Sequence, residues 1–583
     1  MSFFDDASLA FLPSGGAGKD GKAYSIKPTD GSGDFTFSRG SNLAATRVGP
    51  TGLIEKGREN LLTYSNEFDT TWFNGSSSET NGQPDKDGGT DAWLVTKSAA
   101  NGYIGQNITQ SGVTTFSVYA KANDSDYMQF LCDGGAYQFF NLSNGSLAAG
   151  NAIDAEIEAI GTDGWYRCSM VQNASITRAR IYPAENNTTS ASSGSIYIQD
   201  SQLEIGLAAT EVIESGATTG KAGLLEDEPR FDYSGGATCP SLLLEGSRTN
   251  LVSQSEYFGD NSNSNCTIDI NDATSPDGLT TASKVIGSGT DIFIRTRQSV
   301  AVPSAGDYIF SLFAKKGNVT KVEIRALTYS GSTGLTEAKF DLEAGTALTA
   351  GAFIEDYGNG WYKCSTPVTI DAGDLSGSLS IYAIGSNGSI IYSSNADTNG
   401  EYFYTWGWEV EQGSYPTSYI PTYGVSQTRL ADVCKAESVG SLIGQTEGTF
   451  YYEFIKGDDF GVFAVSNNGN SSRFLNYPSG SNYTFFAQSN SGSVLIVANY
   501  AKSNFLEGVN KLAIKYASGV YKAFLNGVEV VSSSIATNDL TLNKVNVNSA
   551  NNDIITAKSP FNKVLIFEIA LSDEACIELT TIS

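Results

Sequence analysis

The side chains able to do chemistry in this chain are mainly carboxylates, tyrosines and lysines. Histidine is absent from all 583 residues, which excludes Ser-His-Asp and Cys-His catalysis and every His-ligated metal site. The 7 cysteines form no CxxC pair. A scattered, odd-numbered set argues against a disulfide framework or a zinc site, so we expect free thiols in a protein made in a reducing cytoplasm.

Three acidic, oxygen-rich loops are candidates for Ca²⁺, which prefers hard oxygen ligands. They are PDKDGGTD at residues 84–91, SPDG at residues 275–278 and KGDD at residues 456–459. None follows the EF-hand spacing, and Asp-Gly is above all a turn signal. The loops therefore predict turns, with calcium as the alternative, and we expect no other cofactor.

Tryptophans are the second group with a binding chemistry, because an indole face suits the apolar face of a sugar ring. Trp72 and Trp93 lie near loop-rich segments, and Trp406 and Trp408 lie in the aromatic segment YFYTWGWEVEQG. These four are the candidate carbohydrate contacts, with burial in a core as the alternative. The aromatic segment alternates bulky and small residues, so it is either buried on both faces or presents one aromatic face to a ligand.

Composition and charge set the class of protein. The 62 glycines, with many Ser, Asn and Thr and 59 Tyr plus Phe, suit short strands joined by tight turns and predict an all-β chain of about three or four domains. The formal net charge of -27 repels phosphate backbones and anionic membrane surfaces, so neither is an expected partner. Since no apolar run approaches the ~20 residues of a membrane span, and the N-terminus does not read as a signal peptide, no membrane insertion is expected.

One five-residue phrase occurs twice, as GWYRC from Gly164 and as GWYKC from Gly360. The phrases on either side of it also occur twice and in the same order. The number of residues between the two members of a matched pair increases along the chain. The matched pairs are LIEKGRENLL with LLEGSRTNLV, SNEF with QSEYF, FSVYAK with FSLFAK, and QLEIG with EVEQG. Such ordered matches indicate a duplicated domain. Trp165 and Trp361 are accordingly predicted to be core residues of its framework.

Two arginines of the repeat are predicted to be structural. Arg58 and Arg248 occupy matching positions, and each has a carboxylate nearby, Glu55 or Glu245. Because guanidinium groups often tie chain segments together, we expect an ion pair or a clamp on backbone carbonyls at the entry to each domain.

The carboxylates and thiols of the repeat do not suggest catalysis. Glycoside hydrolysis needs two carboxylates about 5–9 Å apart across the scissile bond. Glu409 and Glu411 share a strand face, but the other copy has only Glu204, so a framework role is predicted. Cys168 and Cys364 have no histidine to activate them and are predicted to be small core residues. The chain is therefore expected not to be an enzyme.

Local patterns predict strands throughout. Alternation in FSVYAKA puts Phe116, Val118 and Ala120 on one face of a strand. Turn signals at intervals of roughly 8–12 residues favour antiparallel sandwiches or jelly rolls. Beyond Cys434 the repeated phrases stop. There YKAFLNGVEVVSS predicts a hairpin with a type I′ turn at Asn-Gly, and Ser572 is a predicted helix N-cap.

Two family resemblances follow from these phrases. The hairpin and the terminal FNKVLIFEIALSDEACIEL, over about residues 440–583, resemble the concanavalin A-like and laminin-G-like β-sandwiches. DFTFSRGS, AATRV, PRFDY, LLEGSRTNL, GWY[RK] and WEVEQGSYPTSYIPT, over most of residues 30–430, resemble the carbohydrate-binding-module-like jelly rolls of bacteriophage head-fibre, spike and tail-fibre proteins. The second resemblance implies a virion surface protein, assembled in the host cytoplasm as a homotrimer among other virion proteins.

The expected domain order begins with a segment at 1–57 that attaches to another protein or exchanges a strand into the first jelly roll. It continues with that jelly roll at 58–215, a strap at 216–247, a second jelly roll at 248–425 and a concanavalin A-like sandwich at 426–583. The expected function is multivalent binding to host-surface glycans without catalysis, since linked weak sites gain avidity from copy number. The alternatives are a purely structural capsid-decorating protein, a polysaccharide depolymerase and a bacterial adhesin.

Overall fold

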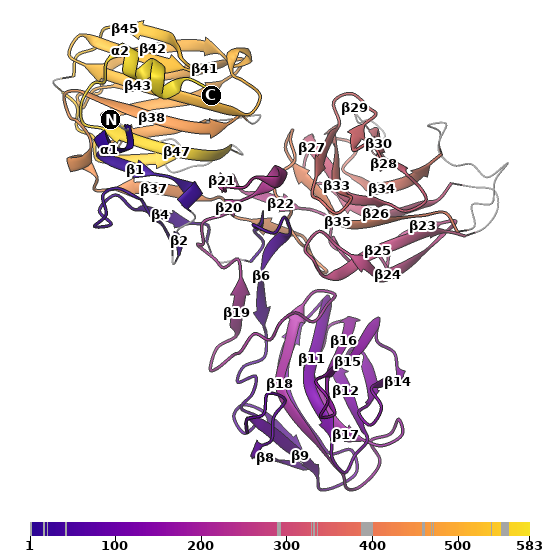
Figure 1. Cartoon of the computed structure of the whole chain (residues 1–583). Coiled ribbons are helices and arrows are strands. Elements are labelled where there is room, and N and C mark those ends of the chain that lie inside the picture. The colour runs from indigo at the N-terminus through magenta and orange to yellow at the C-terminus, as the bar shows by residue number, and fades with distance from the viewer. Residues whose placement is uncertain are drawn as a thin grey trace.

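The computed structural model describes residues 3–15, 18–19, 21–40, 43–288, 293–327, 329, 333–334, 336–385, 400–456, 461–467, 469, 471–537, 539–547, 549 and 559–582. Over these residues the chain is almost entirely antiparallel β-structure, arranged as two jelly rolls, a further sandwich and a small connecting sheet (Figure 1). The predicted all-β fold class of tandem sandwiches is thereby confirmed. No helix in this described part has the length and apolarity to cross a membrane.

The first jelly roll consists of two facing sheets around one core. One sheet has the strand order β14-β13-β12-β17-β10-β7 and the other β15-β16-β11-β18-β9-β8. The strands are β7 (Phe73–Gly75), β8 (Ser77–Gln83), β9 (Ala92–Lys97), β10 (Tyr103–Gln110), β11 (Val113–Ala122), β12 (Tyr127–Asp133), β13 (Tyr137–Asn141), β14 (Ser146–Gly150), β15 (Asp154–Ile160), β16 (Trp165–Asn173), β17 (Ile176–Ala184) and β18 (Ser195–Ile205). Phe116, Val118 and Ala120 on β11 all face this core, as their alternation predicts.

The second jelly roll repeats this topology. Its sheets have the orders β23-β26-β34-β28-β30-β31 and β24-β25-β35-β27-β33-β29, with β32 also paired to β33. The strands are β23 (Ser262–Ser264), β24 (Cys266–Thr274), β25 (Thr280–Gly287), β26 (Arg295–Ala301), β27 (Gly306–Lys316), β28 (Lys321–Leu327), β29 (Thr333–Gly334), β30 (Glu337–Asp341), β31 (Thr346–Ala347), β32 (Phe353–Asp356), β33 (Trp361–Ile370), β34 (Ser376–Ile384) and β35 (Tyr402–Gln412). Trp165 and Trp361 begin the corresponding strands β16 and β33 and are 2% and 1% exposed. The duplication and the core role of both tryptophans are confirmed.

A buried asparagine closes the entry of each jelly roll. Asn60 Nδ2 donates to the carbonyls of Ser201 (3.1 Å) and Ile213 (2.9 Å). Asn250 Nδ2 donates to the carbonyls of Trp408 (3.0 Å) and Ile420 (2.8 Å). The repeated backbone clamp is therefore this asparagine, which stands two residues after the predicted arginine.

The ion pairs predicted for Arg58 and Arg248 are wrong in their partners. Glu55 pairs with Arg47 (2.7 Å), because the β5–β6 register sets these two residues directly opposite each other. Arg248 instead stacks over the Tyr415 ring. Glu245 binds other arginines, described below, and Arg58 forms no ion pair among the described residues.

The third sandwich is assembled from three separate parts of the chain. Its sheets have the orders β20-β21-β47-β38-β43-β44-β45, with β1 also paired to β47, and β2-β3-β4-β37-β46-β39-β40-β41-β42. The elements are α1 (Phe3–Asp6), β1 (Leu9–Phe11), β2 (Gly18–Lys19), β3 (Lys22–Ala23), β4 (Phe35–Ser38), β20 (Phe231–Asp232), β21 (Ser241–Leu244), β37 (Val433–Glu437), β38 (Gly448–Ile455), β39 (Phe463–Ser466), β40 (Arg473–Ser479), β41 (Asn482–Gln488), β42 (Val494–Ala501), β43 (Val509–Ala517), β44 (Val520–Leu525), β45 (Val528–Ser533), β46 (Lys544–Val547), β47 (Ser559–Phe567) and α2 (Asp573–Thr580).

Two local predictions for this sandwich are confirmed. Asn526 and Gly527 have φ values of 51° and 84°, as the type I′ hairpin between β44 and β45 requires. Ser572 Oγ accepts the backbone N–H of Ala575 at 3.1 Å and caps α2.

The N-terminal segment does not exchange into the first jelly roll. Instead β1 pairs with β47 and β4 with β37. Phe11, Phe35 and Phe37 enter the core of the third sandwich, where the rings of Phe11 and Phe35 stack at 4.6 Å. Alternation in FTFS creates an apolar face, and the third sandwich is the sheet pair that covers it. The predicted strap joins the same core through β20 and β21, so both segments belong to this discontinuous domain.

A small sheet connects the third sandwich to the first jelly roll. It has the order β19-β6-β5, from β19 (Gly220–Gly223), β6 (Ile54–Asn60) and β5 (Thr46–Val48). Figure 1 shows β6 and β19 side by side above the first jelly roll. The pair β22 (Arg248–Asn250) and β36 (Gln427–Arg429) joins the ends of the second jelly roll.

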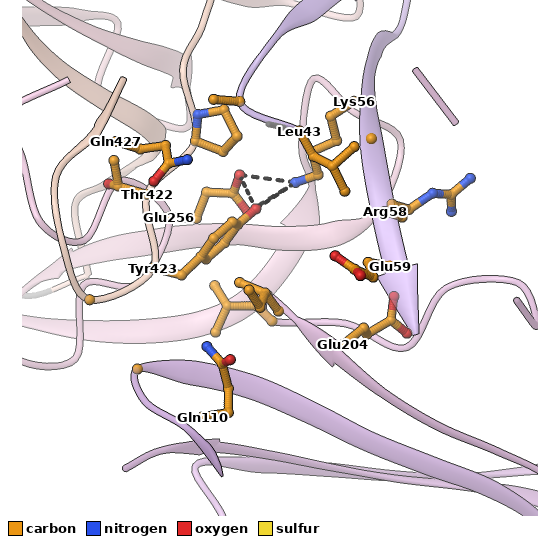
Figure 2. Close-up of a pocket in the computed structure, with 18 of the residues that line it drawn as sticks. Leu43, Lys56, Arg58, Glu59, Gln110, Glu204, Glu256, Thr422, Tyr423 and Gln427 are labelled. Atoms are coloured by element: carbon orange, nitrogen blue, oxygen red, sulfur yellow. Dashed lines mark hydrogen bonds and ion pairs between the residues drawn. The ribbon is translucent and has the colours of Figure 1, made fainter. Parts of the chain in front are cut away.

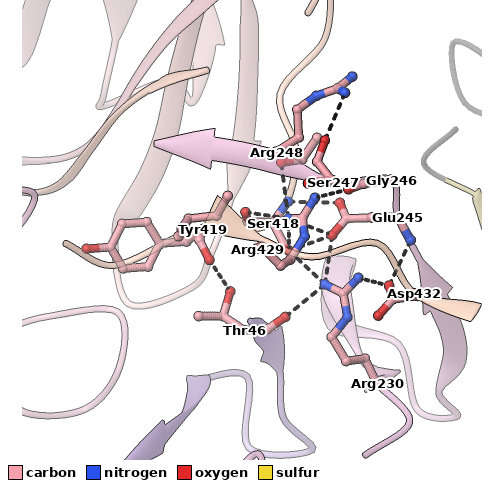
Figure 3. Close-up of polar contacts among 12 residues, drawn as sticks. Thr46, Arg230, Glu245, Gly246, Ser247, Arg248, Ser418, Tyr419, Arg429 and Asp432 are labelled. Carbon is pink, nitrogen blue, oxygen red and sulfur yellow. Dashed lines mark hydrogen bonds and ion pairs between the residues drawn. The ribbon is translucent and has the colours of Figure 1, made fainter. Parts of the chain in front are cut away.

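A fully buried ionic cluster, here called the hub, lies where these parts meet (Figure 3). Arg230 donates to Glu245 at 2.7 Å and also pairs with Asp432. Arg429 donates to the same Glu245 at 3.0 Å, and Arg39 lies 3.5 Å from Asp432. All five side chains are 0% exposed in these pairs. Their desolvation is offset only while every segment is in place.

The two jelly rolls also contact each other directly. Val113, Val171 and Leu207 of the first form one buried cluster with Tyr257 of the second. The approach is close at Gly112, where a Cβ atom would lie 1.9 Å from the carbonyl oxygen of Tyr423. The jelly rolls are thus packed together and not merely tethered.

Breaking the hub should destabilise the protein strongly. Glu245→Gln removes the carboxylate that two buried arginines share, so we expect a loss of about 3–5 kcal/mol in the free energy of unfolding. Denaturant unfolding monitored by tryptophan fluorescence measures it. Glu55→Gln is the matched control, because its ion pair with Arg47 is partly exposed and should contribute less than about 1 kcal/mol. Equal effects of the two substitutions would contradict the role of the hub.

Candidate binding pocket between the jelly rolls

The tryptophans predicted as candidate carbohydrate contacts are all core residues. Trp72 and Trp93 are each 7% exposed, pack around Phe68, and donate their indole N–H groups to the carbonyls of Tyr64 (3.0 Å) and Asn66 (2.9 Å). Their loop-rich sequence surroundings fold over the core and cover the rings. Neither ring face is open to a sugar.

Trp406 and Trp408 are 0% exposed and lie on opposite sides of β35. A β-bulge between them, with Gly407 at a φ of 59°, reverses the alternation that would put both on one face. Trp406 donates to Thr281 Oγ1 and Trp408 to Thr405 Oγ1. The aromatic segment is therefore buried on both faces, which was one of its two predicted arrangements, and the prediction of sugar contacts here is corrected.

The acidic loops use their carboxylates internally. Asp85 accepts backbone N–H groups from Asp87, Gly89 and Asp91, and these hydrogen bonds lower its pKa. Asp277 of SPDG lies 2.9 Å from the Lys56 ammonium group. Residues 457–460, which contain most of KGDD, lie outside the described residues. Within the described ranges no three acidic or thiol groups gather as metal ligands.

The carboxylates and thiols of the repeat are framework groups. Glu204 accepts from the backbone N and Oγ1 of Thr210, and Glu411 accepts from the same two atoms of Thr417. Cys168 and Cys364 are 0% exposed, and burial raises the pKa of both thiols. These groups hold loops and fill cores, as predicted.

A pocket of about 630 Å³ lies between the connecting sheet and the two jelly rolls (Figure 2). Its walls come from β6, from the β10–β11 turn, from the end of β18 and from residues 421–427. The lining mixes hydrogen-bonding side chains with apolar ones. The amides and hydroxyls are Gln110, Asn173, Gln254, Gln427, Thr422 and Tyr423, and the aliphatic members include Leu43, Ile205, Leu207, Leu279 and Val425.

A buried network fixes one wall of the pocket. Lys56 Nζ lies 3.0 Å from Glu256 Oε1 and donates to Tyr423 Oη at 2.8 Å, while the Tyr423 hydroxyl donates to Glu256 Oε1 at 2.8 Å (Figure 2). Burial disfavours the ammonium ion, but Asp277 and Glu256 outweigh it and hold the pKa of Lys56 well above its usual value. The network ties the connecting sheet to the second jelly roll and fixes Tyr423.

The acidic groups of the pocket already have partners. Glu59 accepts from Thr219 Oγ1, Glu226 pairs with Lys221, and Glu204 is held by Thr210. Beside these engaged carboxylates the pocket offers amide groups, hydroxyls and aliphatic surface. Such a lining, at a junction of domains, suits reversible binding of a small polar molecule. No local sequence pattern indicates the pocket, because its walls come from segments far apart in the chain.

The geometry defines a class of protein: tandem jelly rolls and a discontinuous β-sandwich joined by a buried hub. No protein-family model and no curated protein sequence matches the chain. Solved structures that it resembles include the CBM40 of Ruminococcus gnavus IT-sialidase bound to α2,3-sialyllactose, at 15% identity and a TM-score of 0.20, covering 24% of this chain and 84% of that one.

Two further structures resemble larger parts of the chain. The CBM22-1–CBM22-2 tandem of Paenibacillus barcinonensis Xyn10C has 10% identity and a TM-score of 0.19, covering 64% of this chain and 99% of its own. Domains LG4-5 of the mouse laminin α1 chain have 12% identity and a TM-score of 0.18, covering 49% of this chain and 94% of theirs. At these identities and TM-scores, none of the three carries an argument about function.

The second jelly roll should lose stability as the pH rises. Burial raises the pKa of Glu409 to about 7 from its ordinary 4.5, although Lys363 opposes the shift. The folded state therefore keeps a proton that the unfolded chain releases between these values, and the free energy of unfolding should fall from pH 4.5 to 7. Calorimetric Tm values at pH 5 and 7 measure the change.

A reciprocal exchange between the two copies supplies the control. Gln202 and Glu409 occupy equivalent positions, since they accept the backbone N–H groups of Ile213 and Ile420, both at 2.7 Å. Glu409→Gln should flatten the pH dependence in the second jelly roll, and Gln202→Glu should introduce one in the first. An unchanged slope in Glu409→Gln would rule out this carboxyl as its source.

Proposed function

We propose that the chain is a non-catalytic, glycan-binding subunit of a bacteriophage virion appendage or capsid decoration. The observation that carries glycan binding is the pocket between the jelly rolls, with its amides, hydroxyls and aliphatic surface. The virion assignment and the homotrimeric state rest on the fibre-protein phrases. The proposed location is the virion surface, after assembly in the host cytoplasm.

The chemistry of the pocket suits an uncharged segment of a sugar chain. Amide side chains donate and accept at once, as paired sugar hydroxyls require, and Gln110, Gln254 and Gln427 supply three such groups. Aliphatic side chains such as Leu207 and Val425 offer contact to the C–H faces of the ring. The lining carries four carboxylates against three cations, and two of the cations, Lys56 and Lys221, are already paired, which disfavours an anionic ligand here.

Multiple copies would compensate for weak binding by one pocket. Linked sites can raise overall avidity by about 10²–10⁴-fold without any new contact, provided that their geometry allows simultaneous engagement. The hub and the packed junction between the jelly rolls fix that geometry within each subunit. Both chain ends lie in the third sandwich and the first jelly roll projects from it (Figure 1). This arrangement suits attachment through the third sandwich.

Neutral sugars should bind in the pocket, and a bulky side chain introduced into the pocket should prevent that binding. Saturation-transfer NMR with glucose, galactose, mannose, N-acetylglucosamine and their β-1,4-linked dimers is expected to show contact to at least one of them. Gln110→Trp narrows the mouth and should reduce that signal by about tenfold or more. Gln83→Trp, at the end of β8 and outside the lining of the pocket, is the control and should leave the signal unchanged. No contact with any sugar, or equal signals in both variants, would refute the pocket as a glycan site.

Virion membership is tested separately. Antibody raised against the chain should decorate intact phage particles at fibres, spikes or the capsid surface in electron micrographs. Copurification with virions without any glycan binding would favour the purely structural capsid-decorating alternative. Absence from particles would overturn the virion assignment while leaving the glycan test intact.

A further inference from the structure

The sheet of the first jelly roll that contains β17 carries an arginine cluster on the face turned away from the core. Ala179 and Ile181 of β17 point into the core, while Arg178, Arg180 and Tyr182 point outward. The Arg178 guanidinium group lies over the Phe73 ring at 4.9 Å, and that of Arg180 lies over the Tyr103 ring at 4.7 Å. Contact with the rings attracts both guanidinium groups to the outer face of the sheet.

The charge of this cluster is only partly balanced. Asp133 pairs with both Arg178 (3.5 Å) and Arg180, so two guanidinium groups share one carboxylate. Arg178 and Asp133 remain 32% and 26% exposed at their side chains. The face is therefore locally cationic on a chain whose net charge is -27.

The corresponding face of the second jelly roll carries a similar cluster. Arg295 lies over the Phe293 ring at 5.0 Å, and Arg325 lies over the Tyr382 ring at 4.9 Å. Tyr382 on β34 and Tyr182 on β17 occupy equivalent positions. Tyr382 lies opposite a residue of β28, and Tyr182 lies opposite a residue of β12, the corresponding strand of the first jelly roll. Arg325 pairs with Glu323 and, at 3.4 Å, with Glu337, whereas neither Arg295 nor its neighbour Arg297 pairs with a carboxylate among the described residues.

We infer that these two arginine faces are binding sites for carboxylate-bearing saccharides, one on each jelly roll. A planar guanidinium group donates two parallel hydrogen bonds to a carboxylate. Among the described residues, Nη2 of Arg178 and both terminal nitrogens of Arg297 have no partner, while Arg180 already donates to Tyr182 and Arg295 to Ser264. The partly exposed Phe73 and Tyr103 rings beside the arginines provide apolar contact for a sugar ring. The chain's overall negative charge disfavours densely charged polyphosphates and leaves sparsely charged acidic sugars as the fitting ligand class.

The sites are distinct from the pocket proposed above. They lie on the outer faces of the sheets, use cationic donors instead of amides, and select for charge where the pocket selects against it. One subunit would then contact a mixed glycan surface in two ways. The pocket would bind a neutral segment of a sugar chain, and the arginine faces would bind acidic sugar units. The failure of either kind of site leaves the other standing.

Calorimetric titration of the full chain with tetragalacturonate tests the inference. At low ionic strength we expect two sites per chain, and the fully methyl-esterified tetramer, which lacks the charges, should bind at least about tenfold more weakly. The double variant Arg178→Gln/Arg180→Gln should reduce the stoichiometry from two to one, as should Arg295→Gln/Arg297→Gln. Combining the four substitutions should abolish binding.

Controls separate this result from general charge effects. Arg473→Gln removes an arginine that is likewise stacked on a ring, Phe486, but lies in the third sandwich, and it should leave the stoichiometry at two. The pocket variant Gln110→Trp should also leave it at two. Absence of tetragalacturonate binding, equal affinity for the methyl ester or for inorganic triphosphate, or a stoichiometry unaffected by the double variants would overturn the inference.

Discussion

The burial of three arginines with two carboxylates at the hub is the constraint on which the arrangement of the domains depends. Ions removed from water must be paired and hydrogen-bonded almost completely, or folding becomes unfavourable. Here Arg39 comes from the N-terminal segment, Arg230 and Glu245 from the strap, and Arg429 and Asp432 from the end of the second jelly roll. Arg230 and Glu245 pair within the strap, but Arg39 finds its carboxylate, Asp432, and Arg429 finds Glu245 only on another segment, so the segments stabilise one another.

This dependence accounts for the positions of the phrases on which the sequence resemblance depends. SRG contains Arg39, PRFDY contains Arg230, LLEGSR contains Glu245 and PTSYIPT contains Ser418, whose hydroxyl donates to Glu245 at 2.6 Å. These four phrases therefore supply contacts at the junction between the domains. They set the position of the second jelly roll and, through Lys56 and Tyr423, one wall of the pocket.

The sequence was sufficient for features that depend on local pattern or on repetition. Strand alternation located the inward residues of β11, the Asn-Gly pair located the hairpin, and the repeated phrases identified Trp165 and Trp361 as framework. The sequence was insufficient for features that depend on which distant segment a strand pairs with. Alternation in FTFS says which face of β4 is buried but not which sandwich buries it. The N-terminal segment was therefore assigned to the wrong neighbour, and the pocket, formed between segments, left no pattern to find.

The comparison of the two jelly rolls also separates framework from surface chemistry. Shared positions, such as Asn60 with Asn250, do the same structural work at the same atoms. On the outer faces the tyrosines Tyr182 and Tyr382 match, but the charges come from different strands: Arg178 and Arg180 lie on β17, whereas Arg295 lies on β26 and Arg325 on β28. The β17 arginines correspond to serines on β34. If folding required these charges, the same strand would supply them in both jelly rolls, as the same position supplies Asn60 and Asn250. Positive charge supplied by different strands beside equivalent tyrosines is instead a property of the face, and this independence of the scaffold is what a ligand requirement would produce.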